Sequence, residues 1–435
     1  MGERLSSQPV STRLQRIAEQ AKARADWVFT NLAHLIDVDL LREAYKRTRK
    51  DGSPGVDGVT AKQYAADLEA NLSSLHERLR KQQYYAPPVM RTYLEKDDGG
   101  QRPIGKPAFE DKIVQRAGVM LMGAVYEQDF YDCSYGFRPG RSPHHALTQL
   151  RNQCAWGNIN WVVDADVSGF FDSIPHGQLQ EIIKQRVNDG GMLRLIGKWL
   201  NAGVLEGEDL FYPEQGTPQG GVISPLLANI YLHEVLDQWF ERDVKPRMKG
   251  RCYLVRFADD FIIGCELESD AHRIMAVLPK RFGRYGLTIH PTKTKLVQFG
   301  RPKLKDDGKS NGTFGFLGFT HYWAKSRKGT WVVKRKTASK RLRRAGKRVW
   351  QWCRYNRHEP MREQWQTLSS KLRGHYQYYG IRSNYACMRE YYEHVKRAWR
   401  NWLNRRGGKK RLTRPRFDKL LVVFPLPPPR IVHRI

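Results

Sequence analysis

The chain has 435 residues, of which 40% are hydrophobic and 27% charged, a composition typical of a folded protein rather than a disordered one. At roughly 150 residues per domain, this length predicts two or three domains. The formal net charge of +31 is concentrated in residues 324–435, which carry +27, whereas residues 1–323 carry only +4.

The basic end of the chain also holds six of the twelve tryptophans, so its composition is not that of a disordered tail. A folded, aromatic-rich and basic domain indicates a nucleic-acid partner, and a solvated basic surface is the alternative. The six cysteines are scattered without a CxxC pair, which argues against a zinc knuckle and predicts free thiols in a reducing, cytoplasmic compartment. No signal peptide is expected, and the longest apolar stretch, 117–126, is too short to cross a bilayer, so no membrane partner is expected.

The first third of the chain is predicted to combine helices with one hairpin. Apolar residues recur at helical spacing around Trp27 and Leu35, and Thr60 is suited to cap a helix. In chain order we expect a helical region over 11–50, a glycine-rich loop over 51–58, a helix over 60–82, a strand over 89–94, a turn over 97–100 and a helix over 109–126.

The middle of the chain contains two acidic segments. In VVDADVSGFFDS, a strand over 161–166 ends in Asp166 and is followed by Phe170 and Phe171. In VRFADDFIIG, apolar runs flank Asp259 and Asp260, which predicts a hairpin over 253–264 with both carboxylates at its tip. Between these segments we expect helices over 175–186, 193–201 and 225–243, and a tight loop over 216–221.

The carboxylates carry the chemical prediction. Neighbouring carboxylates repel one another unless a cation lies between them. Two Mg²⁺ ions held by carboxylates serve in-line phosphoryl transfer onto a nucleotide. Asp166, Asp259 and Asp260 therefore predict a two-metal site that polymerises nucleotides.

The last part of the chain is predicted to become helical. We expect a helix over 270–285, a short strand over 315–323, a linker, helices from 339 to about 406, and an extended, proline-rich segment over 424–429. Strands that alternate with helices, followed by a basic helical block, predict an α+β fold followed by an all-α domain.

Nine motifs follow one another in an order that is specific as a set: PGVDG, RPIGKPAFEDKIVQRA, YGFRPGRS, VVDADVSGFFDSI, GTPQGGVISPLLANIYL, VRFADDFIIG, GLTIHPTKTKLV, GFLGF and KLRGHYQYYGI. Over residues 27–405 the chain thereby resembles a bacterial group II intron-encoded reverse transcriptase/maturase. The resemblance implies a right-hand polymerase. Its parts would be an N-terminal extension over 1–26, fingers and palm over 27–322, a thumb/maturase domain over 323–406 and a basic, proline-rich tail over 407–435.

The same resemblance assigns roles at the polymerase site. Asp166, Asp259 and Asp260 would be the catalytic carboxylates that hold two Mg²⁺ ions, with Asp166 and Asp259 as the first choices for direct ligands. Phe257 stands where the family usually has Tyr, and either ring can pack beside the primer end. The implied dNTP-binding residues are Lys96, Arg102, Phe171, Gln219 and Lys293.

Three of these nucleotide contacts have an ordinary alternative. Phe171 would exclude a ribose 2′-OH, but one of Phe170 and Phe171 is expected to pack in the core. A lone Lys or Arg is usually a surface residue, so the assignment of Lys96 and Arg102 to the triphosphate depends on the resemblance.

Basic residues further along the chain are expected to meet nucleic acid. Arg138 and Arg141 in YGFRPGRS would contact template or nucleotide, with a structural salt bridge as the alternative for Arg141. A dense cluster in the basic helices suits RNA phosphates and comprises Arg341, Arg343, Arg344, Lys347 and Arg348. Lys409, Lys410 and Arg411 are expected to form a flexible basic arm.

Together these features predict an RNA-directed DNA polymerase and intron maturase. Its partners would be structured intron RNA, an RNA template, a DNA primer, dNTPs and target DNA, and its oligomeric state is open. The best match is to compact, IIC-associated members that lack a C-terminal endonuclease, so retrohoming without second-strand cleavage is expected. Two alternatives stay open: a non-enzymatic RNA-folding cofactor for splicing, and a domesticated reverse transcriptase used in phage defence or CRISPR adaptation.

Overall fold

The computed structural model describes residues 9–95, 100–207, 209–212, 215–217, 220–302, 312–406 and 412–435. The chain divides into two compact units, one formed by Met1–Ala146 with Val163–Leu296 and the other by Leu147–Val162 with Val297–Ile435. The second unit therefore begins earlier than the expected boundary at residue 323 and also includes a segment from the first half of the chain. None of the helices in the described ranges is long and apolar enough to span a membrane.

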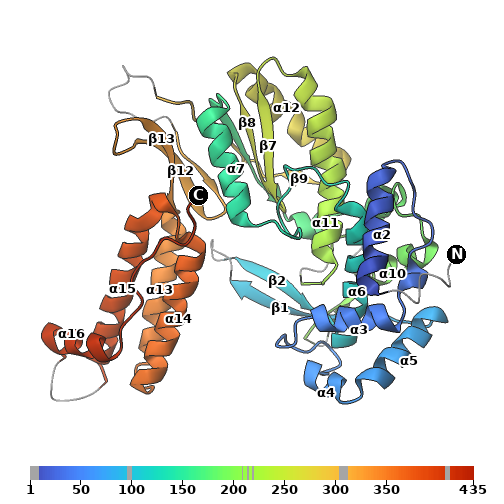
Figure 1. Ribbon diagram of the computed structural model, residues 1–435, viewed down its shortest axis with the longest axis horizontal. Helices are drawn as coiled ribbons and strands as arrows, with labels where there is room; N and C mark the ends of the chain where they lie inside the picture. The colour runs from blue at the N-terminus through green and yellow to red at the C-terminus, as the bar shows by residue number, and fades with distance from the viewer. Residues whose placement is uncertain are drawn as a thin grey trace. The chain divides into compact units, whose positions relative to one another are not determined.

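The first unit contains most of the predicted helices (Figure 1). They are α2 (Val10–Ala23), α3 (Val38–Arg47), α4 (Ala61–Ala66), α5 (Leu68–Arg80), α6 (Phe109–Tyr126), α8 (Phe170–Ser173), α9 (His176–Lys184), α10 (Gly190–Leu200), α11 (Ser224–Leu232) and α12 (Glu268–Arg284). The apolar helix α6 is buried along most of its length, and α2 and α3 pack against it. Residues 10–23 are thus part of this unit's packing.

Three helical predictions need correction. The helix expected over 60–82 is divided at Asp67 into α4 and α5. The region over 11–50 forms two separate helices, because Asp37 caps a new helix by accepting a hydrogen bond from the Leu40 amide. An Arg13–Asp37 ion pair at 2.5 Å then ties α2 to α3. The helix expected over 225–243 is α-helical only to Leu232 and continues as the π-helical segments His233–Gln238 and Phe240–Val244.

Two sheets of the first unit position the predicted site. One has the strand order β2-β1-β5-β6, with β1 (Val89–Glu95) and β2 (Gln101–Lys106) as the expected hairpin and β5 (Val204–Glu206) and β6 (Asp209–Phe211) beside it. The other has the order β10-β3-β8-β7, from β3 (Trp161–Ala165), β7 (Cys252–Phe257), β8 (Asp260–Cys265) and β10 (Lys295–Gln298). Helix α12 packs against β8, as Figure 1 shows.

The second unit is not purely helical. Its helix α7 (Pro143–Trp156) precedes a three-stranded antiparallel sheet of β11 (Phe314–Phe316), β12 (Phe319–Lys325) and β13 (Trp331–Thr337). The expected linker after residue 323 therefore contains β13. Trp331–Thr337 pairs with β12 along its whole length. On the other edge of β13, the Arg335 and Thr337 amides donate to the side chains of Ser383 and Asn384.

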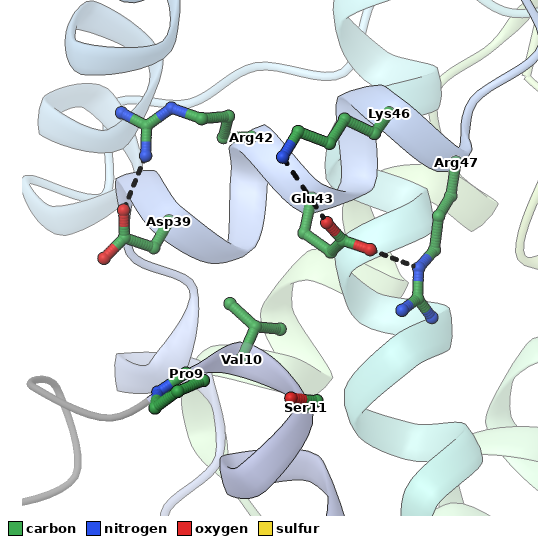
Figure 2. A pocket seen from close by; sticks show the side chains of 8 residues that line it. All are labelled: Pro9, Val10, Ser11, Asp39, Arg42, Glu43, Lys46 and Arg47. Carbon is green, nitrogen blue, oxygen red and sulfur yellow. Dashed lines mark hydrogen bonds and ion pairs between the residues drawn. The ribbon is translucent and has the colours of Figure 1, made fainter.

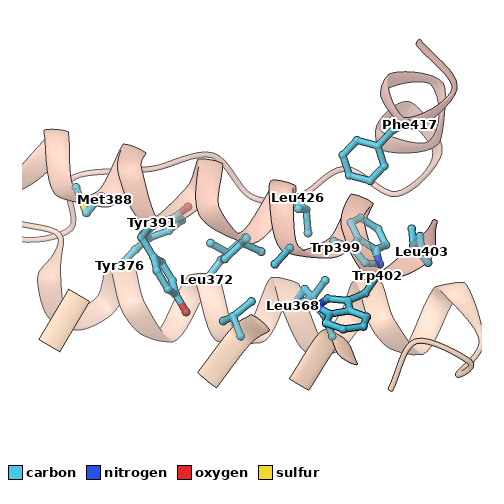
Figure 3. Packing of buried hydrophobic residues seen from close by; sticks show 14 residues of the cluster. Leu368, Leu372, Tyr376, Met388, Tyr391, Trp399, Trp402, Leu403, Phe417 and Leu426 are labelled. Carbon is cyan, nitrogen blue, oxygen red and sulfur yellow. The ribbon is translucent and has the colours of Figure 1, made fainter. Parts of the chain in front are cut away.

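The helices predicted over 339–406 are α13 (Ser339–Tyr355), α14 (Met361–Tyr379) and α15 (Tyr385–Leu403), which run side by side in Figure 1. Figure 3 shows their shared core, in which Leu368, Leu372 and Trp399 are fully buried. The fold is thus an α+β polymerase-like body with a mainly helical C-terminal unit.

The described part of the expected tail packs onto these helices. Residues 414–423 form α16 (Arg414–Val423), whose Phe417 enters the core beside Trp399, with ring centroids 5.8 Å apart. The proline-rich segment is extended, as predicted, but Trp365 Nε1 donates to the Pro425 carbonyl and the Tyr376 hydroxyl donates to the Pro427 carbonyl. Residues 412–435 therefore belong to the helical unit, and the arm expected at 409–411 lies outside the described residues.

Candidate active site

Asp166 lies directly after β3 and is held by the segment that follows α12. The His290 amide donates to the Asp166 carbonyl at 2.8 Å, and the Asp166 amide donates to Thr294 Oγ1 at 3.3 Å. Beyond Asp166, β4 (Val167–Ser168) pairs with β9 (Thr288–Ile289). Lys293 Nζ lies 3.4 Å from the Asp166 carboxylate. Three residues of the HPTKTK motif thus contact Asp166. Of these, only Lys293 was predicted as a site residue, and it was expected to bind the dNTP.

Asp259 lies in a tight turn between β7 and β8. Phe257 pairs with Asp260, so Ala258 and Asp259 form a two-residue hairpin turn. Ala258 adopts the left-handed region with φ of 57°, which is uncommon for a residue with a side chain. The Asp259 side chain is half-buried, whereas Asp260 is exposed at the first position of β8.

The charges of Asp166 and Asp259 act on one another. Burial raises the pKa of Asp259 above its ordinary value, and the negative charge of Asp166 raises it further, while Arg102 and Arg256 act in the opposite direction. Asp166 and Asp259 therefore lie close enough to repel one another. Such a pair is stabilised by a cation, and the Lys293 ammonium supplies one for Asp166 in this structure.

The donor set fits a hard divalent cation, which prefers carboxylate oxygens. Within the described ranges, however, no three His, Cys, Asp or Glu side chains are gathered closely enough to hold a metal ion. The pair that could share an ion is Asp166 with Asp259, and the ligand role of Asp260 stays a prediction.

A buried ion pair holds the turn that carries Asp259. Arg256 is fully buried and donates to both carboxylate oxygens of Asp237, at 2.7 and 2.5 Å. Its remaining guanidinium nitrogen donates to Asn229 Oδ1 at 2.9 Å and to the Ala258 carbonyl at 3.1 Å. Burial works to raise the pKa of Asp237, but the positive charge of Arg256 and its hydrogen bonds to the carboxylate outweigh burial and keep that pKa below its ordinary value. Sequence analysis missed this anchor, although a charged residue in the middle of an apolar strand was a visible signal.

Phe171 lies in α8, just after the strand that leads to Asp166. Phe170 is buried and Phe171 is partly exposed, with their ring centroids 5.3 Å apart, so core packing falls to Phe170. The Thr217 amide donates to the Phe171 carbonyl at 2.7 Å. This places the start of the GTPQGG loop against α8.

Two glycines let this loop run between α8 and the β1–β2 hairpin. Gly216 has φ of 93°, and a Cβ there would lie 2.9 Å from Asp172 Cα. Gly220 has φ of 115°, and a Cβ there would lie 2.2 Å from the Gly105 carbonyl oxygen on β2. Both positions therefore require glycine. Gln219, the predicted nucleotide contact of this loop, lies outside the described residues.

The β1–β2 hairpin brings one predicted cation to the site. Arg102 is exposed on β2, pairs in register with Leu94, and its charge acts on Asp259. Its expected partner Lys96, on the other side of the turn, lies outside the described residues.

The arginines of YGFRPGRS have structural partners. Arg138 is buried and donates to Glu127 at 2.9 Å and to the carbonyls of Tyr131 and Ser134, so its guanidinium has a structural role, and its expected contact with nucleic acid stays a prediction. Arg141 forms an ion pair with Asp132 at 2.5 Å, which is the alternative that sequence analysis left open.

The predicted RNA-binding cluster lies on α13. This helix contains seven Lys and Arg residues and no acidic residue over 339–355. Its apolar face, which includes Val349 and Cys353, packs in the helical core. Of the five predicted RNA contacts, four are exposed and Arg344 is half-buried; the exposed ones are Arg341, Arg343, Lys347 and Arg348.

A separate pocket of about 330 Å³ lies elsewhere in the first unit, between the start of α2 and the side of α3 (Figure 2). Its charged groups are already paired: Arg42 contacts Asp39 at 2.6 Å, and Glu43 contacts Arg47 at 2.8 Å and Lys46 at 4.0 Å. Because these charges offset one another and none of the predicted catalytic residues lines the pocket, it is not the candidate site.

A pair of mutually repelling carboxylates on one sheet, with the cations of Arg102 and Lys293 beside it, fits a nucleic-acid polymerase. Comparison with known proteins agrees. The family described as "Reverse transcriptase (RNA-dependent DNA polymerase)" matches residues 94–321, just over half of the chain. The chain belongs to this reverse transcriptase family.

Individual relatives connect the chain to group II introns. Protein YkfC of Escherichia coli is 32% identical over 326 residues, which cover 64% of this chain and 84% of that protein. Group II intron-encoded protein LtrA of Lactococcus lactis subsp. cremoris is 36% identical over 248 residues, which cover 55% of this chain and 41% of LtrA. Nuclear intron maturase 2 of Arabidopsis thaliana is 29% identical over 175 residues, which cover 32% of this chain and 24% of that protein. The matched segments thus span less than half of the two intron proteins.

Proposed function

We propose that the chain is an RNA-directed DNA polymerase that also binds group II intron RNA and assists its splicing. The observation that carries the proposal is that Asp166 directly follows β3 and Asp259 directly precedes β8, the neighbouring strand of the same sheet, so that the charge of one carboxylate acts on the other. The likeness to LtrA and to an intron maturase supports intron RNA as the RNA partner. By the same likeness, we also propose that the chain binds target DNA and takes part in retrohoming.

The proposed chemistry is attack of the primer 3′-OH on the α-phosphorus of a dNTP. The new bond joins the 3′-oxygen to the α-phosphorus, the bond from the α-phosphorus to the bridging oxygen of the β-phosphate breaks, pyrophosphate leaves, and the 3′-OH proton passes to water. Asp166 and Asp259 would hold divalent ions, which when bound lower the pKa of the 3′-OH and neutralise the triphosphate. Arg102 would bind the triphosphate from β2. Lys293 would move its ammonium from Asp166 to the triphosphate when the ions are present, because they would replace it as the positive charge beside Asp166.

Primer extension tests the polymerase activity directly. The purified chain, supplied with an RNA template, an annealed DNA primer, dNTPs and Mg²⁺, is expected to extend the primer, and addition of a chelator is expected to stop it. A protein that binds intron RNA and promotes its splicing without extending any primer would instead be the non-enzymatic cofactor.

Phe171 is proposed to exclude ribonucleotides through the bulk of its partly exposed ring. Substitution Phe171→Ala is expected to raise incorporation of rNTPs relative to dNTPs by about tenfold or more, because a small pocket change alters discrimination by that order. The measurement is the ratio of kcat/KM for dCTP and CTP. Phe170→Leu is the matched control: it should lower the unfolding temperature, since Phe170 is buried, and leave the ratio unchanged. Equal selectivity in wild type and Phe171→Ala would remove Phe171 from this role.

The basic cluster on α13 is proposed to contact RNA phosphates. The double variant Lys347→Ala with Arg348→Ala should weaken binding of a group II intron RNA and lower the slope of log K against log salt by roughly 1 to 2. The control is Lys46→Ala with Arg47→Ala, which removes the same charge from a pair already bound to Glu43. An unchanged slope for the α13 variant, or an equal loss in the control, would contradict a specific role for this cluster.

A further inference from the structure

Phe137 combines two properties that rarely occur together. Its backbone lies in the left-handed region, with φ of 58°, and its side chain is 60% exposed. Bulky residues seldom adopt this backbone conformation, and non-glycine residues that do so cluster at functional sites. An exposed aromatic ring also forgoes the benefit of burial. Neither property contributes to the stability of the fold, so both call for another explanation.

The segment around Phe137 is fixed against the strand that leads to the carboxylate turn. The Tyr135 amide donates to the Arg256 carbonyl at 2.9 Å, and the Arg256 amide donates to the Cys133 carbonyl at 2.8 Å. Gly136 comes so close to the turn that a Cβ there would lie 2.3 Å from the Ala258 nitrogen. Asn229 Nδ2 also donates to the Gly136 carbonyl at 2.8 Å.

These contacts leave the Phe137 ring no place in the core. The backbone of Gly136 is pressed against Ala258 on one side of it, and Arg138 is bonded to Glu127 and internal carbonyls on the other. The strained conformation at Phe137 is therefore imposed by well-bonded neighbours. It turns the ring outward at a defined position.

The outward ring lies beside the turn that carries Asp259. The Phe137 and Phe257 ring centroids are 6.4 Å apart with an interplanar angle of 42°, within the range of an aromatic pair. Phe257 itself pairs in register with Asp260 and precedes Asp259 by two residues. The two rings thus form an aromatic surface next to the carboxylates, and Phe137 is the more exposed of the two.

We propose that Phe137 contacts the terminal nucleotide of the primer, with its ring extending the surface of Phe257 beneath the base or sugar that carries the 3′-OH. The proposal rests on the polymerase function proposed above and assigns a primer contact to a residue outside the carboxylate and dNTP sets. An uncharged ring suits a base or a sugar, which stacks on aromatic faces. An uncharged ring does not suit a triphosphate, whose proposed contacts, Arg102 and Lys293, lie on other segments.

Substitution Phe137→Gly separates this role from a structural one. Glycine adopts the left-handed region without strain, so the unfolding temperature of the variant should equal or exceed that of the wild type. Loss of one base–aromatic stack should nevertheless reduce kcat/KM for the primer–template by about 5- to 100-fold. The KM for the dNTP should stay within about twofold, because the triphosphate contacts are untouched.

Two further variants complete the experiment. Phe137→Tyr keeps the ring and should retain wild-type extension, and Tyr85→Ala, which removes another exposed ring of the same unit, should also retain it. The proposal is overturned if Phe137→Gly extends primers as the wild type does, if its loss follows a lower unfolding temperature, or if Phe137→Tyr fails equally. If the wild type and the Phe137→Gly variant extend primers equally well, this contact alone is refuted. If the wild type extends no primer, the polymerase function is refuted and this contact with it.

Discussion

Removal of the two turn carboxylates is expected to abolish DNA synthesis while RNA binding persists. In the double variant Asp259→Ala with Asp260→Ala, primer extension should fall by about a thousandfold or more. Charge stabilisation by bound metal amounts to several kcal/mol, and roughly 1.4 kcal/mol corresponds to a factor of ten in rate. The measurement is extension of a DNA primer on an RNA template, together with a filter-binding assay of intron RNA.

The control for this variant is another adjacent aspartate pair, Asp306→Ala with Asp307→Ala, which changes net charge equally. It should extend primers at the wild-type rate. RNA binding by the Asp259/Asp260 variant should be unchanged, because the basic excess lies in residues 324–435. Residual extension at more than about a tenth of the wild-type rate would mean that the carboxylate turn is not the site of chemistry.

The second large effect is expected on stability, from the buried pair beneath the turn. Asp237→Ala leaves the guanidinium of Arg256 buried without its counter-charge, and loss of one partner of a buried pair costs about 3–5 kcal/mol. The unfolding midpoint in urea should therefore fall markedly. Arg256 also donates to the Ala258 carbonyl, next to Asp259 in the turn. Displacement of Arg256 should therefore shift the Asp259 carboxylate and lower the rate of primer extension as well.

A second substitution distinguishes the unpaired charge from lost packing. Asp237→Leu combined with Arg256→Met replaces both partners by apolar groups of similar size and should recover much of the lost stability. Glu77→Ala, which removes an exposed ion pair with Lys81 on α5, should barely change the midpoint. If Asp237→Ala unfolds at the same urea concentration as Glu77→Ala, the buried pair does not anchor this region.

Local sequence patterns were sufficient for the strongly periodic elements. The helix expected over 109–126 is α6 with the same bounds, and the apolar stretch over 117–126 within it is largely buried. The acidic hairpin was also predictable, since apolar runs flank its turn on both sides. The expected place of both carboxylates at the tip was only partly right, because the turn is Ala258–Asp259 and Asp260 is the first residue of β8. Thr60 and Gln63 form the capping box that starts α4, as the expected cap at Thr60 required.

Other elements depended on contacts that no local pattern encodes. The sequence of β13 was interpreted as a linker, yet its backbone pairs with β12 on one side and donates to Ser383 and Asn384 on the other. The proline-rich segment is extended as predicted, but its attachment comes from indole and phenol groups on α14, far away in the sequence. In both cases tertiary hydrogen bonds decided the outcome, and composition carried no sign of them.

The site shows the same division. The resemblance to a family indicated Asp166 and Asp259, and the structure brings their charges together. The residues that fix them, Thr294 beside Asp166 and the Arg256–Asp237 pair beneath the turn, were missed because their roles arise from packing of separate segments. The outward position of Phe137 likewise follows from the close approach of Gly136 to Ala258.

The most direct test of this account is to locate divalent ions by anomalous scattering from Mn²⁺ in crystals of the protein bound to an RNA template, a DNA primer and a dNTP. The account predicts at least one ion at coordination distance, about 2.1 Å, from carboxylate oxygens of both Asp166 and Asp259. Ions bound elsewhere, with these two carboxylates sharing none, would contradict it.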